Sequence, residues 1–142
     1  MLIVDSGAWL ALANPRDRLH ERVRTALAAV REPLVTTTPV LTETSHLLLA
    51  RLGTNALLRF VSSWAANAFQ VFELHTQHAP RIAVLMKKYA DLPMDLADAS
   101  LVVLAEQLGH GRILSTDQRD FRSYRWKNRH PFQNLLERAT AE

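Results

Sequence analysis

The stretch LIVDSG at residues 2–7 is typical of a buried strand that leads directly into a helix. Three consecutive apolar residues suit the interior of a parallel sheet, where both faces of a strand are covered. Asp5 follows at the point where such a strand ends, and Gly7 comes two positions later. The same order recurs in RILSTD at residues 112–117, where Asp117 closes another apolar run. The sequence thus places an acid directly after each of two strand-like runs.

Strand-like and helix-like segments alternate along the sequence. Besides residues 2–4, short β-branched or alternating runs predict strands at residues 34–37, 69–74 and 112–116. Apolar residues at helical spacing predict helices at about residues 19–30, 38–51, 54–64, 82–89 and 95–108. Thr38 and Pro39 suit the N-cap and the first turn of the second of these helices. The alternation predicts an α/β fold, a three-layer α/β/α sandwich around a central, mostly parallel sheet.

Length and composition describe an ordinary globular chain. We expect residues 1–142 to form a single domain, because this length is that of one typical domain. Hydrophobic residues make up 48% and charged residues 22%, and no apolar run approaches the length of a membrane span. No charged leader precedes the first strand, and the chain has no cysteine. We therefore expect a cytoplasmic protein without a membrane partner.

Four acidic residues stand beside the predicted strands and helices: Asp5, Glu43, Asp98 and Asp117. Asp5 and Asp117 also suit a helix N-cap, and Asp98 suits the first turn of a helix that Asp95 caps. Glu43 is in line with the apolar face of its predicted helix, a position where surface glutamates are rare. Individually, these residues leave a structural role and a role in a site both open.

Together, the four acids favour a metal site. The carboxyl ends of parallel strands meet at one edge of a sheet, where ligands bind in this class of fold. Carboxylates about 5 Å apart at an effective dielectric near 20 would repel by roughly 3 kcal/mol per pair. A domain that is stable by only ~5–15 kcal/mol tolerates this repulsion only with protons or a cation. Oxygen ligands suit Mg²⁺ or Mn²⁺, and such an ion activates water for phosphodiester hydrolysis.

Four motifs resemble the PIN domain family, in particular VapC-type toxins of bacterial toxin–antitoxin pairs. They are LIVDS at residues 2–6, TTPVLTE at 37–43, LPMDLADASL at 92–101 and LSTDQRDF at 114–121. The resemblance extends from residue 2 to about residue 126 in motif order and spacing. It implies a five-stranded sheet, an endoribonuclease that depends on Mg²⁺ or Mn²⁺, an RNA substrate and inhibition by a cognate antitoxin.

The resemblance also assigns roles to individual residues. It implies that Asp5, Glu43, Asp98 and Asp117 form the catalytic, metal-binding quartet. Ser6 and Thr116 are then hydroxyl neighbours that orient a carboxylate or water. We expect the first three acids to be the main ligands, with Asp117 at a second ion or beside a water molecule. Asp95 and Asp120 lie inside the motifs, and we interpret both as capping or supporting residues.

Two surfaces are candidates for partners. The basic tail at residues 119–129 is expected to contain a short edge strand. It carries Arg119 and Arg122, which could contact RNA phosphates, while its aromatic residues Tyr124 and Trp126 are expected to pack inward. The apolar residues of the predicted helix pair at residues 38–64 are interpreted mostly as core: Leu47, Leu48, Leu57, Leu58, Val61 and Trp64. An excess of them at the surface would form a groove for an antitoxin segment or the seam of a homodimer.

Two other functions share part of this pattern of acids. A PIN fold that binds RNA or protein without cleavage would share all four motifs. A phosphatase of the haloacid dehalogenase type also has an Asp after its first strand, but it needs a second Asp two residues later. Gly7 occupies that position here, which argues against the phosphatase.

Overall fold

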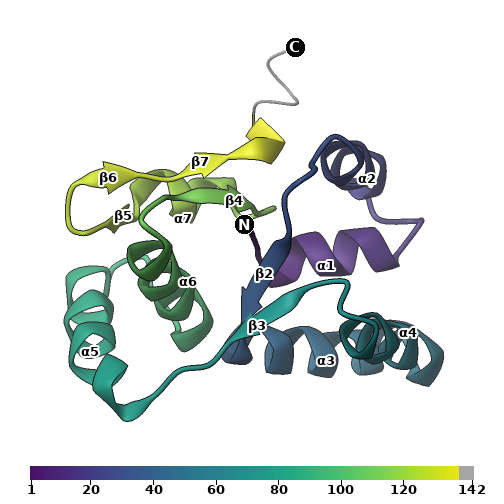
Figure 1. The fold of residues 1–142 in the computed structure, drawn as a ribbon, viewed down its shortest axis with the longest axis horizontal. Coiled ribbons are helices and arrows are strands. Elements are labelled where there is room, and N and C mark those ends of the chain that lie inside the picture. The colour runs from purple at the N-terminus through teal and green to yellow at the C-terminus, as the bar shows by residue number, and fades with distance from the viewer. Residues whose placement is uncertain (138–142) are drawn as a thin grey trace.

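The computed structural model describes residues 1–137 and contains a five-stranded parallel sheet in the order β3-β2-β1-β4-β7. Its strands are β1 (Leu2–Val4), β2 (Leu34–Thr37), β3 (Gln70–Phe72), β4 (Arg112–Leu114) and β7 (Gln133–Asn134). Helices lie on both faces of this sheet (Figure 1). The three-layer α/β/α fold with five strands is therefore confirmed.

The helices divide between the two faces of the sheet. One face is covered by α1 (Ser6–Ala13), α2 (His20–Ala28), α3 (Thr38–Leu52) and α4 (Thr54–Ala65). The other face carries α5 (Ala79–Lys88), α6 (Leu96–Leu108) and α7 (Gln118–Ser123), and the short 3₁₀ helix η1 (Thr76–His78) precedes α5. In Figure 1 these groups lie to the right and to the left of the sheet.

The central strand β1 is the most deeply buried element. Leu2, Ile3 and Val4 have no exposed surface, because β2 and β4 pair with this strand on its two sides. The chain passes from β1 outward to β2 and β3, and later returns to the other side of β1 as β4. This reversal of direction opens a crevice beyond the carboxyl ends of β1 and β4, the usual ligand site of such sheets.

Three details of the sequence interpretation were wrong. The N-cap of α3 is Thr37, whose hydroxyl accepts the Val40 N–H, so Thr38 already belongs to the helix. The tail strand β5 (Arg125–Trp126) pairs with β6 (His130–Pro131) in a separate antiparallel ribbon, while the main sheet gains β7. Several residues that were expected in the core are exposed instead: Leu58, Val61 and Trp64.

The exposed apolar residues follow from the way α4 packs. This helix buries Ala56 and Phe60, which are one turn apart, and Leu57 packs against the core beside them, while Leu58, Val61 and Trp64 are exposed. Phe60 stacks on Phe69, and Trp9 meets both rings. Within residues 1–137, none of the helices is long and apolar enough to cross a membrane.

Candidate active site

A cavity of about 360 Å³ lies beyond the carboxyl ends of β1 and β4. It is lined by Asp5, Ser6, Gly7, Glu43, Leu92, Pro93, Asp95, Asp98, Thr116, Asp117 and Asp120. The structure thus brings together all four acids of the predicted quartet and both predicted hydroxyl neighbours. Two further carboxylates, Asp95 and Asp120, line the same space. We call it the acidic cavity, since none of these lining residues carries a positive charge.

Three helices begin at this cavity, and an aspartate caps each of them. Asp5 accepts the Ser6 N–H at 2.6 Å at the start of α1, and Asp117 accepts the Asp120 N–H at 3.1 Å at the start of α7. Asp95 and Asp98 form a reciprocal capping box at the start of α6. The capping roles inferred from the sequence are therefore present, and the same acids also converge on the cavity. Helix N-termini favour negative charge, so both roles are compatible.

Asp5 is the best-fixed carboxylate of the cavity. It is only 6% exposed, and its Oδ2 accepts the Ser115 hydroxyl at 2.9 Å. The Ser6 hydroxyl lies 3.4 Å from Asp5 Oδ1 and 3.1 Å from Glu43 Oε1, so it connects the two acids. Burial raises the pKa of Asp5 to about 6, although the hydrogen bonds from Ser115 and Ser6 act in the opposite direction.

Asp98 is half-buried beside the exposed Asp95. Burial, and then the charge of Asp95, raise the pKa of Asp98 to about 8. The Tyr124 hydroxyl donates to Asp98 Oδ2 at 3.2 Å. The pKa of Tyr124 is raised too, by burial and by the negative charge of Asp98, so the phenol stays protonated and remains a donor.

Asp117 is the third acid with a perturbed titration. Burial raises its pKa, and the side chain of Asp120 acts in the same direction. A shift of one pKa unit corresponds to about 1.4 kcal/mol of difference between the two protonation states. Without a cation, the folded protein therefore disfavours full ionisation of these carboxylates.

Gly7 allows α1 to approach Thr116 closely. A Cβ atom at position 7 would lie 1.9 Å from the Thr116 Oγ1 atom and 3.2 Å from its Cβ atom. The first distance is far inside van der Waals contact, so any larger residue here would displace Thr116 from the cavity wall. Thr116 itself lines the cavity, but the hydroxyl that binds Asp5 from this segment belongs to Ser115.

The donor set fits a hard divalent cation. Only oxygen donors converge here, several carboxylates have raised pKa values, and no positive side chain lines the cavity. The charge of Arg119, outside the wall, acts against the rise in the pKa of Asp117 only in part. Within the described residues, no three acids or histidines already stand in ligand positions. Asp98 Oδ2 and Asp117 Oδ1 accept backbone N–H groups in this arrangement.

The two arginines predicted to contact RNA do not line the acidic cavity. Arg119 and Arg122 lie on α7 with exposed side chains, and Arg122 pairs with Glu137. Tyr124 is fully buried, as expected for an inward-packing aromatic residue, and Trp126 is half-buried.

The sequence did not mark Ser115 and Tyr124 as site residues. The only local signal was the hydroxyl pair at residues 115–116 and the buried aromatic after a basic helix. Their contacts with Asp5 and Asp98 join residues that are 110 and 26 positions apart, so they depend on the packed fold.

Comparison with known proteins agrees with this architecture. The family model described as PIN domain matches residues 2–127. The chain is 28% identical over 124 residues to Ribonuclease VapC26 of Mycobacterium tuberculosis (strain ATCC 25618 / H37Rv), an alignment that covers 87% of this chain and 92% of that protein.

A solved structure shows the same fold. The crystal structure of Mycobacterium tuberculosis VapC20, described as a sarcin–ricin loop cleaving toxin, superposes with a TM-score of 0.78 at 20% identity. The superposed region covers 84% of this chain and 92% of the VapC20 chain. Together with the family match over most of the sequence, these findings show that the chain belongs to the PIN domain family.

Proposed function

We propose that this protein is a metal-dependent endoribonuclease of the VapC type, the toxin of a toxin–antitoxin pair. The observation that carries the proposal is the acidic cavity, where six carboxylates meet and no lining residue is positively charged. The relative named Ribonuclease VapC26 and the PIN family match support RNA as the substrate class. The surplus of negative charge repels a phosphodiester, and a bound cation would offset that repulsion.

The proposed ligands of Mg²⁺ or Mn²⁺ are Asp5, Glu43 and Asp98, with Asp117 at a second ion or beside the attacking water. Such an ion would activate water and neutralise the charge that develops on the phosphoryl group. Ser115 and Ser6 hold Asp5 in one orientation, and Ser6 also holds Glu43. The Tyr124 hydroxyl does the same for Asp98. Water adds to phosphorus as the 3′ oxygen leaves, which gives a 5′ phosphate and a 3′ hydroxyl.

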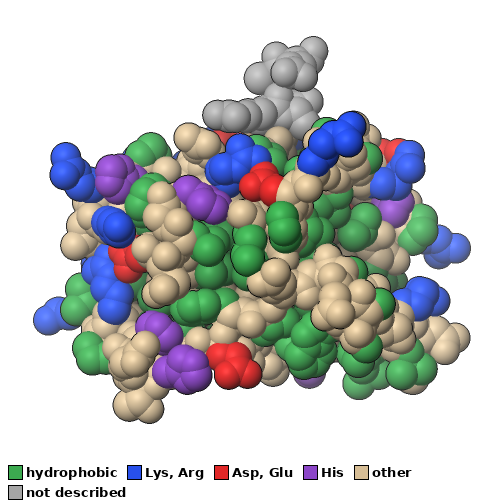
Figure 2. Space-filling view, viewed as in Figure 1, with side chains coloured by type: hydrophobic (Ala, Val, Ile, Leu, Met, Phe, Trp, Pro, Cys, Tyr) green, Lys and Arg blue, Asp and Glu red, His purple; other side chains and the backbone are tan. Residues whose placement is uncertain are grey.

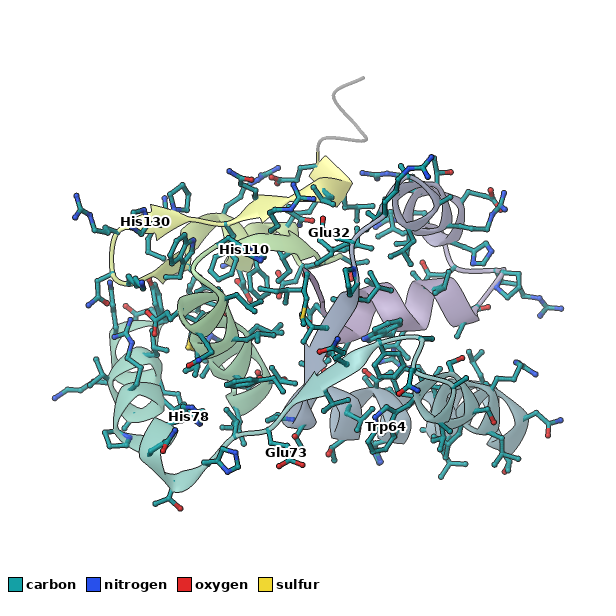
Figure 3. All side chains as sticks on the ribbon, in the orientation of Figure 1. Glu32, Trp64, Glu73, His78, His110 and His130 are labelled. Atoms are coloured by element: carbon teal, nitrogen blue, oxygen red, sulfur yellow. The ribbon has the colours of Figure 1, made fainter. Side chains whose placement is uncertain are left out.

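The proposed antitoxin partner has a candidate surface on α3 and α4. Exposed apolar side chains gather there: Leu49, Leu52, Leu58, Val61 and Trp64. Figure 2 shows hydrophobic side chains over these helices at the lower right, and Figure 3 labels Trp64 in the same region. Exposed apolar groups of this kind mark interaction surfaces. The alternative occupant is a second copy of the chain, and sedimentation of the isolated protein before and after Leu58→Glu distinguishes a homodimer through this face from a monomer.

The test of the proposed function is RNA cleavage by the purified chain with Mn²⁺. We expect Asp5→Asn to lower the rate by about a hundredfold or more, because loss of a group that acts in the transition state costs several kcal/mol. Asp91→Asn is the matched control, since Asp91 is exposed and does not line the acidic cavity. Mapped fragments should carry 5′ phosphates. Equal cleavage by the unaltered and Asp5→Asn proteins would assign the activity to a contaminant and contradict the proposal.

The same experiment separates cleavage from binding alone. A PIN fold that binds RNA without turnover would retain RNA in a binding assay but leave it intact with Mg²⁺ or Mn²⁺. That result would favour the non-cleaving alternative over the ribonuclease.

A further inference from the structure

A second cavity, of about 370 Å³, adjoins the acidic cavity. It is lined by Arg18, Leu19, Arg22, Thr116 and Gln118. Thr116 belongs to the walls of both cavities, so the two spaces meet at this residue. We call the second space the arginine cavity. A site rich in carboxylates therefore lies directly beside a site with two guanidinium groups.

The segment that carries Arg18 is fixed by local hydrogen bonds. Asp17 accepts the Leu19 N–H at 2.8 Å through its side chain and the His20 N–H at 3.0 Å through its carbonyl. The ring of His20 is 2.8 Å from the Ala11 carbonyl, which ties the start of α2 to α1. The turn before α2 thus places Arg18 at a defined position beside the cavity.

The two arginines differ in their surroundings. Arg18 is exposed, and within residues 1–137 no ion pair or hydrogen bond of its side chain is found. Arg22 is half-buried, and its Nη2 donates to the Leu136 carbonyl at 3.4 Å. The Gln118 amide adds a neutral donor to the same wall. Guanidinium and amide donors of this kind match the oxygens of a phosphate group.

We propose that the arginine cavity is a phosphate-binding subsite for the RNA backbone phosphate next to the one that is cleaved. This inference rests on the proposed ribonuclease function. An RNA chain that enters a cluster of carboxylates is repelled at the scissile phosphate, and a guanidinium at the neighbouring phosphate offsets that repulsion. Arg18, rather than Arg119 or Arg122, is then the main positioning residue for the substrate.

One arm of the test measures anion binding independently of cleavage. Tripolyphosphate is titrated into the full chain, and the side-chain NMR signals of arginine Nε–H and glutamine amide groups are followed. We expect the signals of Arg18 and Gln118 to shift, while those of Arg16, in the same turn but outside the cavity wall, stay in place. Arg18→Ala should weaken the binding about tenfold, the scale of one charged hydrogen bond. Equal shifts at Arg16 and Arg18 would show nonspecific attraction and overturn the subsite.

The other arm uses an oligouridylate of about ten nucleotides, a length typical of single-strand sites, at several salt concentrations without divalent ions. Arg18→Ala should lower the slope of log affinity against log salt by about 0.7, the value for one lost phosphate contact. Arg16→Ala is the charge-matched control and should keep the slope of the unaltered protein. Arg22 is left in place because it also donates to the backbone.

The outcomes separate the two proposals. An unchanged affinity and slope in Arg18→Ala, together with cleavage that depends on Asp5, would overturn the subsite and keep the ribonuclease. A tripolyphosphate response at Arg18 without any cleavage that depends on Asp5 would keep an anion site and contradict the ribonuclease.

Discussion

Asp5 and Asp98 combine a fixed geometry with an unfavourable charge. Their pKa values rise to about 6 and about 8 because burial disfavours the ionised carboxylates. Ser115 and Tyr124 nevertheless direct hydroxyl donors at them, which orients the carboxylates. Such groups are typical of functional sites, where orientation is kept at the expense of stability. Neutralising one of them should therefore stabilise the protein when no cation is bound.

Asp98→Asn should raise the free energy of unfolding of the metal-free protein by roughly 1 kcal/mol or more at about pH 9, where Asp98 is mostly ionised. The amide keeps an oxygen that can accept from Tyr124 and from the backbone of Asp95. Urea unfolding with a chelator measures the change. Asp91→Asn controls for the loss of one surface charge and should have no effect. A destabilised Asp98→Asn protein would contradict strain at this position.

Helices α1, α6 and α7 all begin at the acidic cavity and carry most of its acids. The starts of α1 and α6 could be predicted from the sequence, because an acid at a helix cap is a local signal. Asp117 was interpreted as a turn or N-cap residue, but α7 itself was not predicted. Strands β1 and β2 were predicted at their observed bounds, also from local signals. The position of Glu43 on the inward side of α3 was also inferred from helical periodicity.

Strand β7 could not be predicted in this way. It is two residues long and polar, and it pairs with β4. Hydrogen bonds between Asn134 and Ser115 hold it there. The Asn134 side chain accepts the Ser115 N–H at 3.2 Å and donates to the Ser115 carbonyl at 2.9 Å. These bonds connect residues 19 positions apart, so no local pattern announces them.

Gly7→Ala tests the contact between α1 and the segment after β4. The added methyl group must displace Thr116, since its position is 1.9 Å from the hydroxyl oxygen. We expect a loss of roughly 1–3 kcal/mol in the free energy of unfolding, as for other overpacked sites. Ribonuclease activity should fall as well, because Thr116 lines both the acidic and the arginine cavity.

Unfolding in urea and cleavage with Mn²⁺ measure these two effects. Gly53→Ala is the control for adding a methyl group, because nothing lies within 4 Å of a Cβ atom there, although its φ of 91° makes that change strained as well. It should lower stability without a selective loss of cleavage. Full activity and stability in Gly7→Ala would contradict the close packing at Thr116.

At the scale of the whole molecule, an acidic and a basic cavity lie side by side and share the wall residue Thr116. The resemblance of four motifs to the PIN family identified the acids. Three of these motifs lie at the end of a strand, and the fourth, at residues 92–101, leads into α6. The arginine cavity was not foreseen, because Arg18 and Gln118 are far apart in the sequence and line one cavity only in the folded chain. Sites that several elements build together carry no local sequence signal.

The pH dependence of stability should report the acidic cavity. An acid whose pKa is higher in the folded than in the unfolded chain binds its proton more tightly when folded, so stability falls as pH rises between the two values. For Asp5 and Asp98 this window extends from about 4 to about 8. Glu21 and Glu32 have lowered pKa values, so the stability that they contribute is lost only as the pH falls below their ordinary pKa of 4.5.

The quantity to measure is the difference in the free energy of unfolding between Asp98→Asn and the unaltered protein, both without metal. We expect this difference to grow between about pH 5 and about pH 8 and to level off above it. Saturating Mn²⁺ should reverse it at the upper end, because the cation binds the folded, ionised site. A difference that is independent of pH would contradict the raised pKa of Asp98.

Calorimetric titration of Mn²⁺ into the full chain at about pH 8 tests the central claim most directly, because it detects the cation without requiring turnover. The account predicts saturable binding to the unaltered protein and to Asp91→Asn, and an affinity at least about tenfold weaker in Asp5→Asn, where one charged ligand is lost. Equal affinity in all three proteins, or no binding to the unaltered chain, would contradict a metal centre in the acidic cavity.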